Sequence, residues 1–222
     1  MSNSTLISVM KDMTNAIDSL WIMICGILVF FMQAGFAMLE VGSVRAKNAQ
    51  NILLKNLLDV CLGTMIWWWF GYGFAYGETK GEIIGTNQFA GVGFSGSSYR
   101  DWFFQWAFAA TAATIVSGAL AERTQFLAYS IFSCIITTWI YPLVVKWTWG
   151  GGWLASGGYV DFAGSGIVHL VGGIAALCGA WIVGPREGRF EKEKKEEFKP
   201  HNMPLVVLGT FVLWFGWYGF NS

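Results

Sequence analysis

Long apolar runs alternate with short polar segments along the whole chain. The runs hold roughly 18 to 25 residues, the helical length that crosses a hydrocarbon core about 30 Å thick. They fall at residues 20–39, 52–76, 102–120, 126–145, 161–183 and 203–222. The pattern therefore predicts an all-α polytopic membrane protein with about six transmembrane helices.

The polar segments between these runs predict loops of different kinds. Residues 77–101 are rich in Gly and Ser and predict the longest loop on their side of the membrane. Residues 121–124 are too few for anything but the turn of a helical hairpin. Residues 186–199 form a charge cluster. Residues 1–18 carry charges and do not resemble a cleaved signal peptide. We expect them to be an extracellular segment ahead of a transmembrane domain at 19–222.

Composition strengthens this interpretation and excludes several function classes. The chain is 55% hydrophobic and 13% charged, whereas soluble domains carry about a quarter charged residues. Its 14 Lys and Arg balance its 14 Asp and Glu, so no basic face favours nucleic acid. The four cysteines lie in separate apolar runs without metal-ligand spacing, so we interpret them as small packed residues and expect no metal or cofactor.

The positions of Lys and Arg predict the orientation, because these residues are retained in cytoplasmic loops. Counted over alternate loops, ten lie on one side of the membrane and four on the other. The ten are Arg45, Lys47, Lys55, Arg123, Arg186, Arg189, Lys192, Lys194, Lys195 and Lys199. The four are Lys11, Lys80, Arg100 and Lys146. We therefore expect the N-terminus outside, residues 186–199 in the cytoplasm, and the plasma membrane as the location.

Two ionisable residues of the fifth run are costly in a bilayer and need a reason to be there. Asp161 stands at the start of the run, where a carboxylate can cap backbone N–H groups, so a structural explanation is as good as a functional one. His169 lies eight residues further on, about 12 Å deeper at helical rise. A neighbouring helix could satisfy this imidazole, but its depth favours a conduction pathway.

Aromatic and small residues mark the same region. Alanines and glycines on the third and fifth runs would let helix backbones approach closely. Phe104 and Phe108 interrupt the alanines, where a ring can be plain packing or a plug in a narrow pore. Trp147, Trp149 and Trp153 fit an aromatic belt at the outer interface, which is the simpler interpretation without other evidence.

The chain resembles the ammonium transporter (Amt) family from about residue 18 to residue 222. The resemblance rests on six ordered segments. They are residues 34–40 (AGFAMLE), 118–123 (GALAER), 149–152 (WGGG), 161–186 (DFAGSGIVHLVGGIAALCGAWIVGPR), 201–204 (HNMP) and 216–221 (GWYGFN). Segment 161–186 resembles the family signature over its whole length.

The resemblance implies a role for each candidate residue. Phe108 and Trp149 match the aromatic residues that recruit ammonium in an outer vestibule, and Phe108 with Phe220 matches a two-ring gate. His169 matches the first of two histidines that line an apolar pore carrying ammonia. Asp161 matches an aspartate of structural and electrostatic importance. The resemblance further implies a homotrimer that transports ammonium and is not an enzyme.

The resemblance covers only the N-terminal half of the family fold. Family members have about eleven helices in two inverted five-helix repeats, and this chain corresponds to the first repeat plus the start of the second. The second pore histidine would lie beyond Ser222, so we expect conduction to need a complementary C-terminal half. An ammonium sensor and a non-conducting half-subunit are the alternatives. An Rh-type ammonia channel is less favoured, because Trp149 in its WGGG context suits the Amt branch better.

Overall fold

Six helical segments are long and apolar enough to cross a membrane, which confirms the predicted fold class. A computed structural model describes residues 2–79 and 81–222, and all regular elements among them are helical. The spans are Asn3–Ser43 (α1), Ala46–Tyr76, Ser98–Leu120 (α4), Phe126–Trp147, Ser165–Val183 and Met203–Phe220 (α9). The protein is therefore an integral membrane protein.

Three of these spans contain a π-helical turn. The second consists of η1 (Ala46–Asn48), α2 (Ala49–Ile66), the π turn η2 (Trp67–Gly71) and α3 (Tyr72–Tyr76). The fourth consists of α5 (Phe126–Ile135), the π turn η4 (Ile136–Ile140) and α6 (Tyr141–Trp147). The fifth consists of the π turn η5 (Ser165–Leu170) and α8 (Val171–Val183). Short helices outside the spans are η3 (Phe89–Gly91), α7 (Trp153–Ser156) and η6 (Lys192–Phe198).

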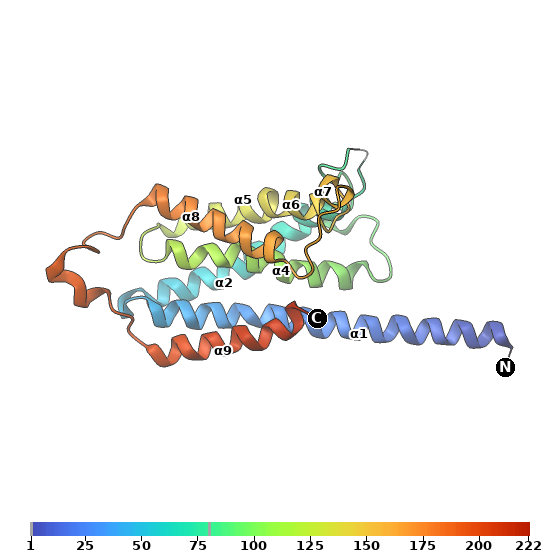
Figure 1. The fold of residues 1–222 in the computed structure, drawn as a ribbon, viewed down its shortest axis with the longest axis horizontal. Helices are drawn as coiled ribbons and strands as arrows, with labels where there is room; N and C mark the ends of the chain where they lie inside the picture. Colours follow the sequence, from blue (N-terminus) through green and yellow to red (C-terminus); the bar gives the residue numbers. More distant parts are fainter. Residues whose placement is uncertain (1, 80) are drawn as a thin grey trace.

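The helices run side by side along the long axis of the molecule (Figure 1). Helices α1 and α9 form one side of the bundle, α2 and α4 its middle, and α5, α6 and α8 the other side. Helix α4 is central because its alanines, from Ala107 to Ala113, are buried between α1 and α8. Small side chains there let three helices share one core.

Helices α1 and α9 pack backbone against backbone. A Cβ on Gly42 would lie 2.7 Å from the backbone nitrogen of Val206, and one on Gly209 would lie 2.6 Å from the carbonyl oxygen of Gly35. Glycine is therefore needed on both helices of this pair. At the start of α9, the Asn202 side chain accepts a hydrogen bond from the Leu205 nitrogen at 3.1 Å and caps the helix.

Several element boundaries differ from the sequence prediction. Helix α1 begins at Asn3 rather than near residue 20, because the Ser2 hydroxyl caps the backbone nitrogen of Thr5 at 3.2 Å and no helix breaker follows. Helix α4 begins at Ser98, which shortens the loop predicted at 77–101. The fifth span is helical only from Ser165 onward.

The charge count also needs a correction. Lys55 was counted with the loop residues, but it lies inside α2 and is buried. Lys80 lies outside the described residues. Lys146 was counted on the other side, but it is also buried, inside α6. Without Lys55 and Lys146 the asymmetry is nine against three, so the predicted orientation stays a prediction.

Candidate functional site

Four aromatic residues from different parts of the chain form one continuous row. Phe108 of α4 contacts Trp149 edge to face, with ring centroids 5.8 Å apart. On its other side Phe108 stacks on Phe220, the last residue of α9, at 4.4 Å. The Phe220 ring lies 5.2 Å from the imidazole of His169. The structure therefore brings together all four predicted recruitment, gate and pore residues.

The row differs in exposure from one end to the other. Phe108 and Phe220 are buried, with 2% and 4% of their surface exposed. Trp149 and His169, at the two ends, are partly exposed. The stacked rings of Phe108 and Phe220 therefore lie between the partly exposed indole of Trp149 and the partly exposed imidazole of His169. None of the four side chains carries a fixed charge.

Asp161 organises the backbone beside this row. Its carboxylate accepts four backbone N–H bonds, from Gly164, Ser165, Gly166 and Ile167, at 2.8 to 3.0 Å. Burial alone would raise the pKa of this carboxyl group, but the four backbone bonds outweigh burial and lower its pKa. The geometry is that of a carboxylate capping the start of η5.

The same loop fixes the orientation of Trp149. Its indole Nε1 donates a hydrogen bond to the carbonyl oxygen of Asp161 at 2.7 Å. Gly164 has a φ of +93°, a conformation that favours glycine, and a Cβ there would lie 3.1 Å from the Trp149 ring. Asp161 therefore holds the η5 turn through its side chain and the Trp149 indole through its main chain.

His169 lies in the π turn η5, and its backbone nitrogen donates to the carbonyl of Gly164 at 3.0 Å. Neither ring nitrogen of His169 forms a hydrogen bond with another described residue. An imidazole at membrane depth needs such partners or a water-filled path. The His169 ring contacts Phe220 on one side and is partly exposed.

A second polar region lies deeper in the bundle, between α1, α2, α4 and α5. Lys55 Nζ lies 3.7 Å from Glu40 Oε2 and 3.0 Å from the carbonyl oxygen of Ser117, to which it donates. The Ser117 hydroxyl donates to Glu40 at 2.7 Å. The Tyr129 hydroxyl donates to Asp59 at 2.5 Å, and Lys55 Nζ lies 4.6 Å from the centre of its ring. We call Glu40, Lys55, Asp59, Ser117 and Tyr129 the charged cluster.

A polar cavity of about 140 Å³ connects the charged cluster with the hairpin after α4. Lys55, Tyr129 and Glu122 are among its lining residues. Glu122 is also held by Arg45, whose Nε lies 2.9 Å from its carboxylate, and by Arg186. Burial would raise the pKa of Glu122, but the hydrogen bonds from Arg45, Asn48 and Arg186 lower it to about 2.

Sequence reasoning missed the charged cluster. Glu40 was assigned to a polar stretch and Lys55 to a loop, while Asp59 was not singled out. The available signal was their spacing, because Lys55 and Asp59 lie four residues apart in an apolar run and so share one helix face. No group of His, Cys, Asp and Glu in the described part of the chain could hold a metal ion.

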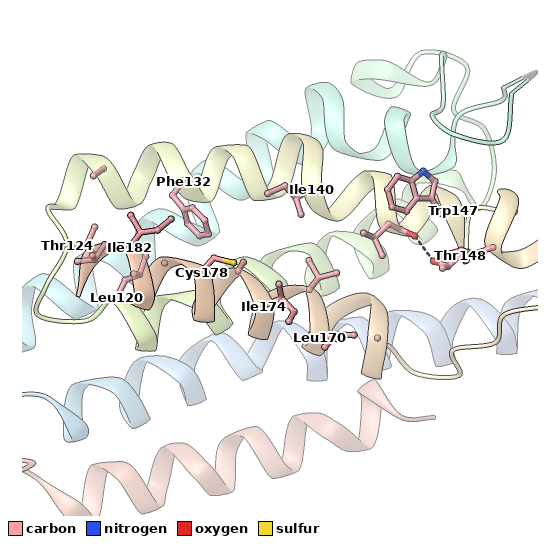
Figure 2. Close-up of a pocket in the computed structure, with 18 of the residues that line it drawn as sticks. Leu120, Thr124, Phe132, Ile140, Trp147, Thr148, Leu170, Ile174, Cys178 and Ile182 are labelled. Carbon is pink, nitrogen blue, oxygen red and sulfur yellow. Dashed lines mark hydrogen bonds between the residues drawn. The ribbon is translucent and has the colours of Figure 1, made fainter. Parts of the chain in front are cut away.

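A hollow of about 790 Å³ lies elsewhere, between α8 and the α5–α6 span. Figure 2 shows Phe132 and Ile140 facing Ile174 and Cys178 across it. Its lining is almost wholly apolar and includes neither Phe108 nor His169. The groove is therefore separate from the aromatic row.

Comparison with known proteins gives one consistent result. A model of the Ammonium Transporter Family matches residues 20–222. Ammonium transporter Amt2 of Archaeoglobus fulgidus is 46% identical over 219 residues, which cover 93% of this chain and 47% of the relative. Ammonium transporter 1 member 3 of Solanum lycopersicum is 48% identical, covering 95% and 48%. The chain spans about half the length of the curated relatives that it matches.

Solved structures agree with the sequence comparison. A protein described as Sensor Amt Protein superposes with a TM-score of 0.91 at 38% identity, covering 95% of this chain and 55% of its own. The crystal structure of Candida albicans Mep2 superposes with a TM-score of 0.82 at 35% identity, covering 92% and 47%. Both likenesses extend over nearly the whole chain.

Proposed function

This chain belongs to the ammonium transporter family, and from that premise we propose that it supplies one wall of an ammonium pathway through a membrane. Ammonium is recruited between Trp149 and Phe108, leaves its proton to water at the gate, and passes His169 as ammonia. Its named relatives are transporters rather than enzymes.

The single observation that carries this proposal is the row from Trp149 through Phe108 and Phe220 to His169, with spacings of 5.8, 4.4 and 5.2 Å. Aromatic faces attract a cation by about 0.5–2 kcal/mol, which selects it without trapping it. The two stacked rings obstruct a hydrated ion more than a small neutral molecule. The charged ammonium ion is therefore bound at the Trp149 end of the row, and neutral ammonia passes at the His169 end.

We further propose that the pathway needs a complementary half and assembles as a homotrimer in the plasma membrane, with the N-terminus outside. The ring nitrogens of His169 form no hydrogen bond with another described residue, which supports the need for a second wall, because lipid cannot satisfy a polar group. The length of the relatives supports it as well, since this chain covers 47% of one and 48% of another.

The decisive test compares this chain alone with the same chain joined to the complementary half of the Archaeoglobus relative, both reconstituted in liposomes. We expect ammonium-evoked current or ammonia flux only from the joined protein, and its loss on His169→Ala. Selective flux through the chain alone, abolished by His169→Ala, would show that one wall suffices.

Trp149→Leu in the joined protein tests recruitment. Removal of the indole face should weaken selection of ammonium and raise the concentration for half-maximal current about two- to thirtyfold, the equivalent of about 0.5–2 kcal/mol. Trp153→Leu is the matched control, because Trp153 is an exposed interface tryptophan outside the row. Equal behaviour of the two variants would make Trp149 an interface anchor only.

A sensor is the second candidate, and the TM-score of 0.91 to the Sensor Amt Protein is the observation that favours it. A sensor would bind ammonium at Trp149 and Phe108 without sustained flux. Two results together would select this alternative. Ammonium should quench tryptophan fluorescence in a way that is lost in Trp149→Leu, and the joined protein should carry no current.

A further inference from the structure

The charged cluster contains one more carboxyl group than it contains cations. Glu40 of α1 and Asp59 of α2 share a single ammonium group, that of Lys55. These are the buried charged residues of α1 and α2, and they are 4%, 2% and 5% exposed in that order. With all three groups ionised, two carboxylates and one ammonium would leave a net negative charge inside the helix bundle.

The surrounding helices offer no charge that could balance this excess. Residues 102–120 of α4 and residues 126–145 of the fourth span contain no Asp, Glu, Lys or Arg. The titratable groups that α5 adds beside Asp59 are the Tyr129 phenol and the Cys134 thiol, which are neutral at pH 7. At the hairpin, Glu122 is already paired with two arginines.

Buried oxygen atoms of the same region lack hydrogen-bond partners. Glu40 Oε2 accepts from Ser117 Oγ at 2.7 Å and from Asn56 Nδ2 at 3.4 Å. Glu40 Oε1, the other oxygen of this carboxyl group, has no partner among the described residues, and neither does Asn56 Oδ1. Glu40 and Asn56 are each 4% exposed, and buried polar atoms normally have partners. The site therefore has both an excess negative charge and a buried oxygen that can take up a proton.

One proton resolves both features. A buried group without a compensating charge changes its protonation state rather than stay ionised, and a single proton makes the charged cluster neutral. Two carboxyl groups that share one cation titrate as a pair, so this proton belongs to Glu40 and Asp59 together. A metal ion does not fit, because no group of His, Cys, Asp and Glu in the part of the chain that the structure describes could hold one.

The polar cavity of about 140 Å³ gives such a proton a route to the hairpin after α4. It extends from Lys55 and Tyr129 at its inner end to Glu122 and Thr124 at the hairpin, with Asn51 also in its lining. The Thr124 hydroxyl is buried and has no partner among the described residues. A polar cavity of this size has room for several water molecules.

We propose that the charged cluster is a proton-binding site, in which Glu40 and Asp59 together hold one proton at neutral pH and exchange it with water at the hairpin through the polar cavity. The proton comes from water and returns to water, so the exchange needs no other reactant. The inference does not depend on ammonium transport, and its tests measure no flux.

Infrared spectroscopy of the full chain in an ester-free detergent tests for the bound proton, because a protonated carboxyl group has a carbonyl band that a carboxylate lacks. We expect this band at pH 7. It should be lost in Glu40→Gln and also in Asp59→Asn, since either substitution leaves one carboxylate to balance Lys55.

Glu187→Gln is the matched control and should leave the band unchanged, because Glu187 is exposed. Both cluster variants are balanced in charge, so we expect them to elute as the unaltered chain does. Absence of the band from the unaltered chain, or its persistence in either folded cluster variant, would overturn the proposal.

Exchange into D₂O tests the route, since deuteration shifts the same band. Thr124→Ile places an apolar group in the lining of the cavity, so we expect the shift to become about tenfold slower, as for a polar path that loses its partners. Thr210→Ile is the control, because Thr210 is exposed on α9 and outside the cavity lining. Equal exchange rates in the two variants would refute the proposed route.

Discussion

The aromatic row and the charged cluster differ in how they place polar groups within the membrane. The row from Trp149 to His169 has no fixed charge, and its imidazole forms no hydrogen bond with another residue that the structure describes. The charged cluster holds Glu40, Lys55 and Asp59, each at most 5% exposed and each ligated by side chains or main chain. Charge in this fold is thus tolerated where neighbouring helices enclose it, while the surface proposed to meet the substrate is uncharged.

The difference has an energetic basis. A buried ion pair gains little overall, because desolvation offsets attraction, but removal of one partner leaves an uncompensated charge. Two stacked rings carry no charge, so the removal of one ring costs only the contact energy between them. The charged cluster should therefore govern stability and the aromatic row should govern selectivity.

Lys55→Met should have the largest effect. The substitution leaves Glu40 and Asp59 without their shared cation, so we expect the free energy of unfolding to fall by about 3–5 kcal/mol. Thermal unfolding in detergent, followed by loss of the monodisperse elution peak, measures this. Lys47→Met is the control, because Lys47 is exposed near the N-terminal end of the same span.

The double variant Lys55→Met with Glu40→Gln sharpens this prediction. Removal of a negative charge together with the positive one should recover part of the lost stability, by about 1–3 kcal/mol relative to additive effects. Strict additivity, or a Lys55→Met variant as stable as Lys47→Met, would mean that the charged cluster does not act as a unit.

Glu122→Gln should have an intermediate, pH-dependent effect. The pKa of Glu122 is lowered from 4.5 to about 2 in the folded chain, so its stabilisation is present above pH 4.5 and is lost as the pH falls towards 2. At pH 7 we expect a loss of about 2 kcal/mol, the worth of hydrogen bonds to a charged group. The difference from the unaltered chain should shrink between pH 4.5 and pH 3.

Thermal unfolding in detergent from pH 7 to pH 3 measures the effect of Glu122→Gln. Glu187→Gln is the matched control, because Glu187 is exposed near the same charges and forms no ion pair with another described residue. A destabilisation by Glu122→Gln that is constant over this pH range would contradict the ionic origin of the effect.

Phe220→Leu should have the smallest effect on stability. Leucine keeps most of the buried apolar surface and loses the stacking on Phe108, so we expect a loss of about 1 kcal/mol. Phe215→Leu, on the exposed side of the same helix, is its control. If Phe220→Leu lowered the free energy of unfolding as much as Lys55→Met, the aromatic row and the charged cluster would not differ in their contribution to stability.

Sequence reasoning succeeded where the signal was local. Hydropathy predicted six spans because each transmembrane helix must by itself be long and apolar enough to cross the bilayer. The Asp161 carboxylate and the nitrogens that it caps lie within six residues of each other, so their spacing suggested a cap. His169 was singled out by its depth in an apolar run and Phe108 as a ring among alanines. The gate pairing of Phe108 with Phe220 and the recruitment role of Trp149 came only from the family resemblance, since nothing in their spacing would place rings from α4 and α9 in contact.

The features that were missed depend on contacts between helices. Glu40 and Ser117 are 77 residues apart in the chain, and Tyr129 and Asp59 are 70 apart. A pattern along one helix does not specify which other helix will satisfy a buried charge. The π turns were missed for a similar reason: a Cβ on Gly71, at the end of η2, would lie only 2.8 Å from the carbonyl oxygen of Thr137 in η4, a proximity that only the folded bundle defines.

The close pairing of α1 with α9 has a consequence for biogenesis. Helix α1 leaves the ribosome well before α9, the helix with which it packs most extensively. At about 5–20 residues per second, the roughly 160 residues between Ser43 and Met203 take about 8–32 s to synthesise. During that interval the glycine face around Gly35 and Gly42 meets lipid or the insertion machinery instead of α9. The yield of inserted protein should therefore depend on how long that machinery retains α1.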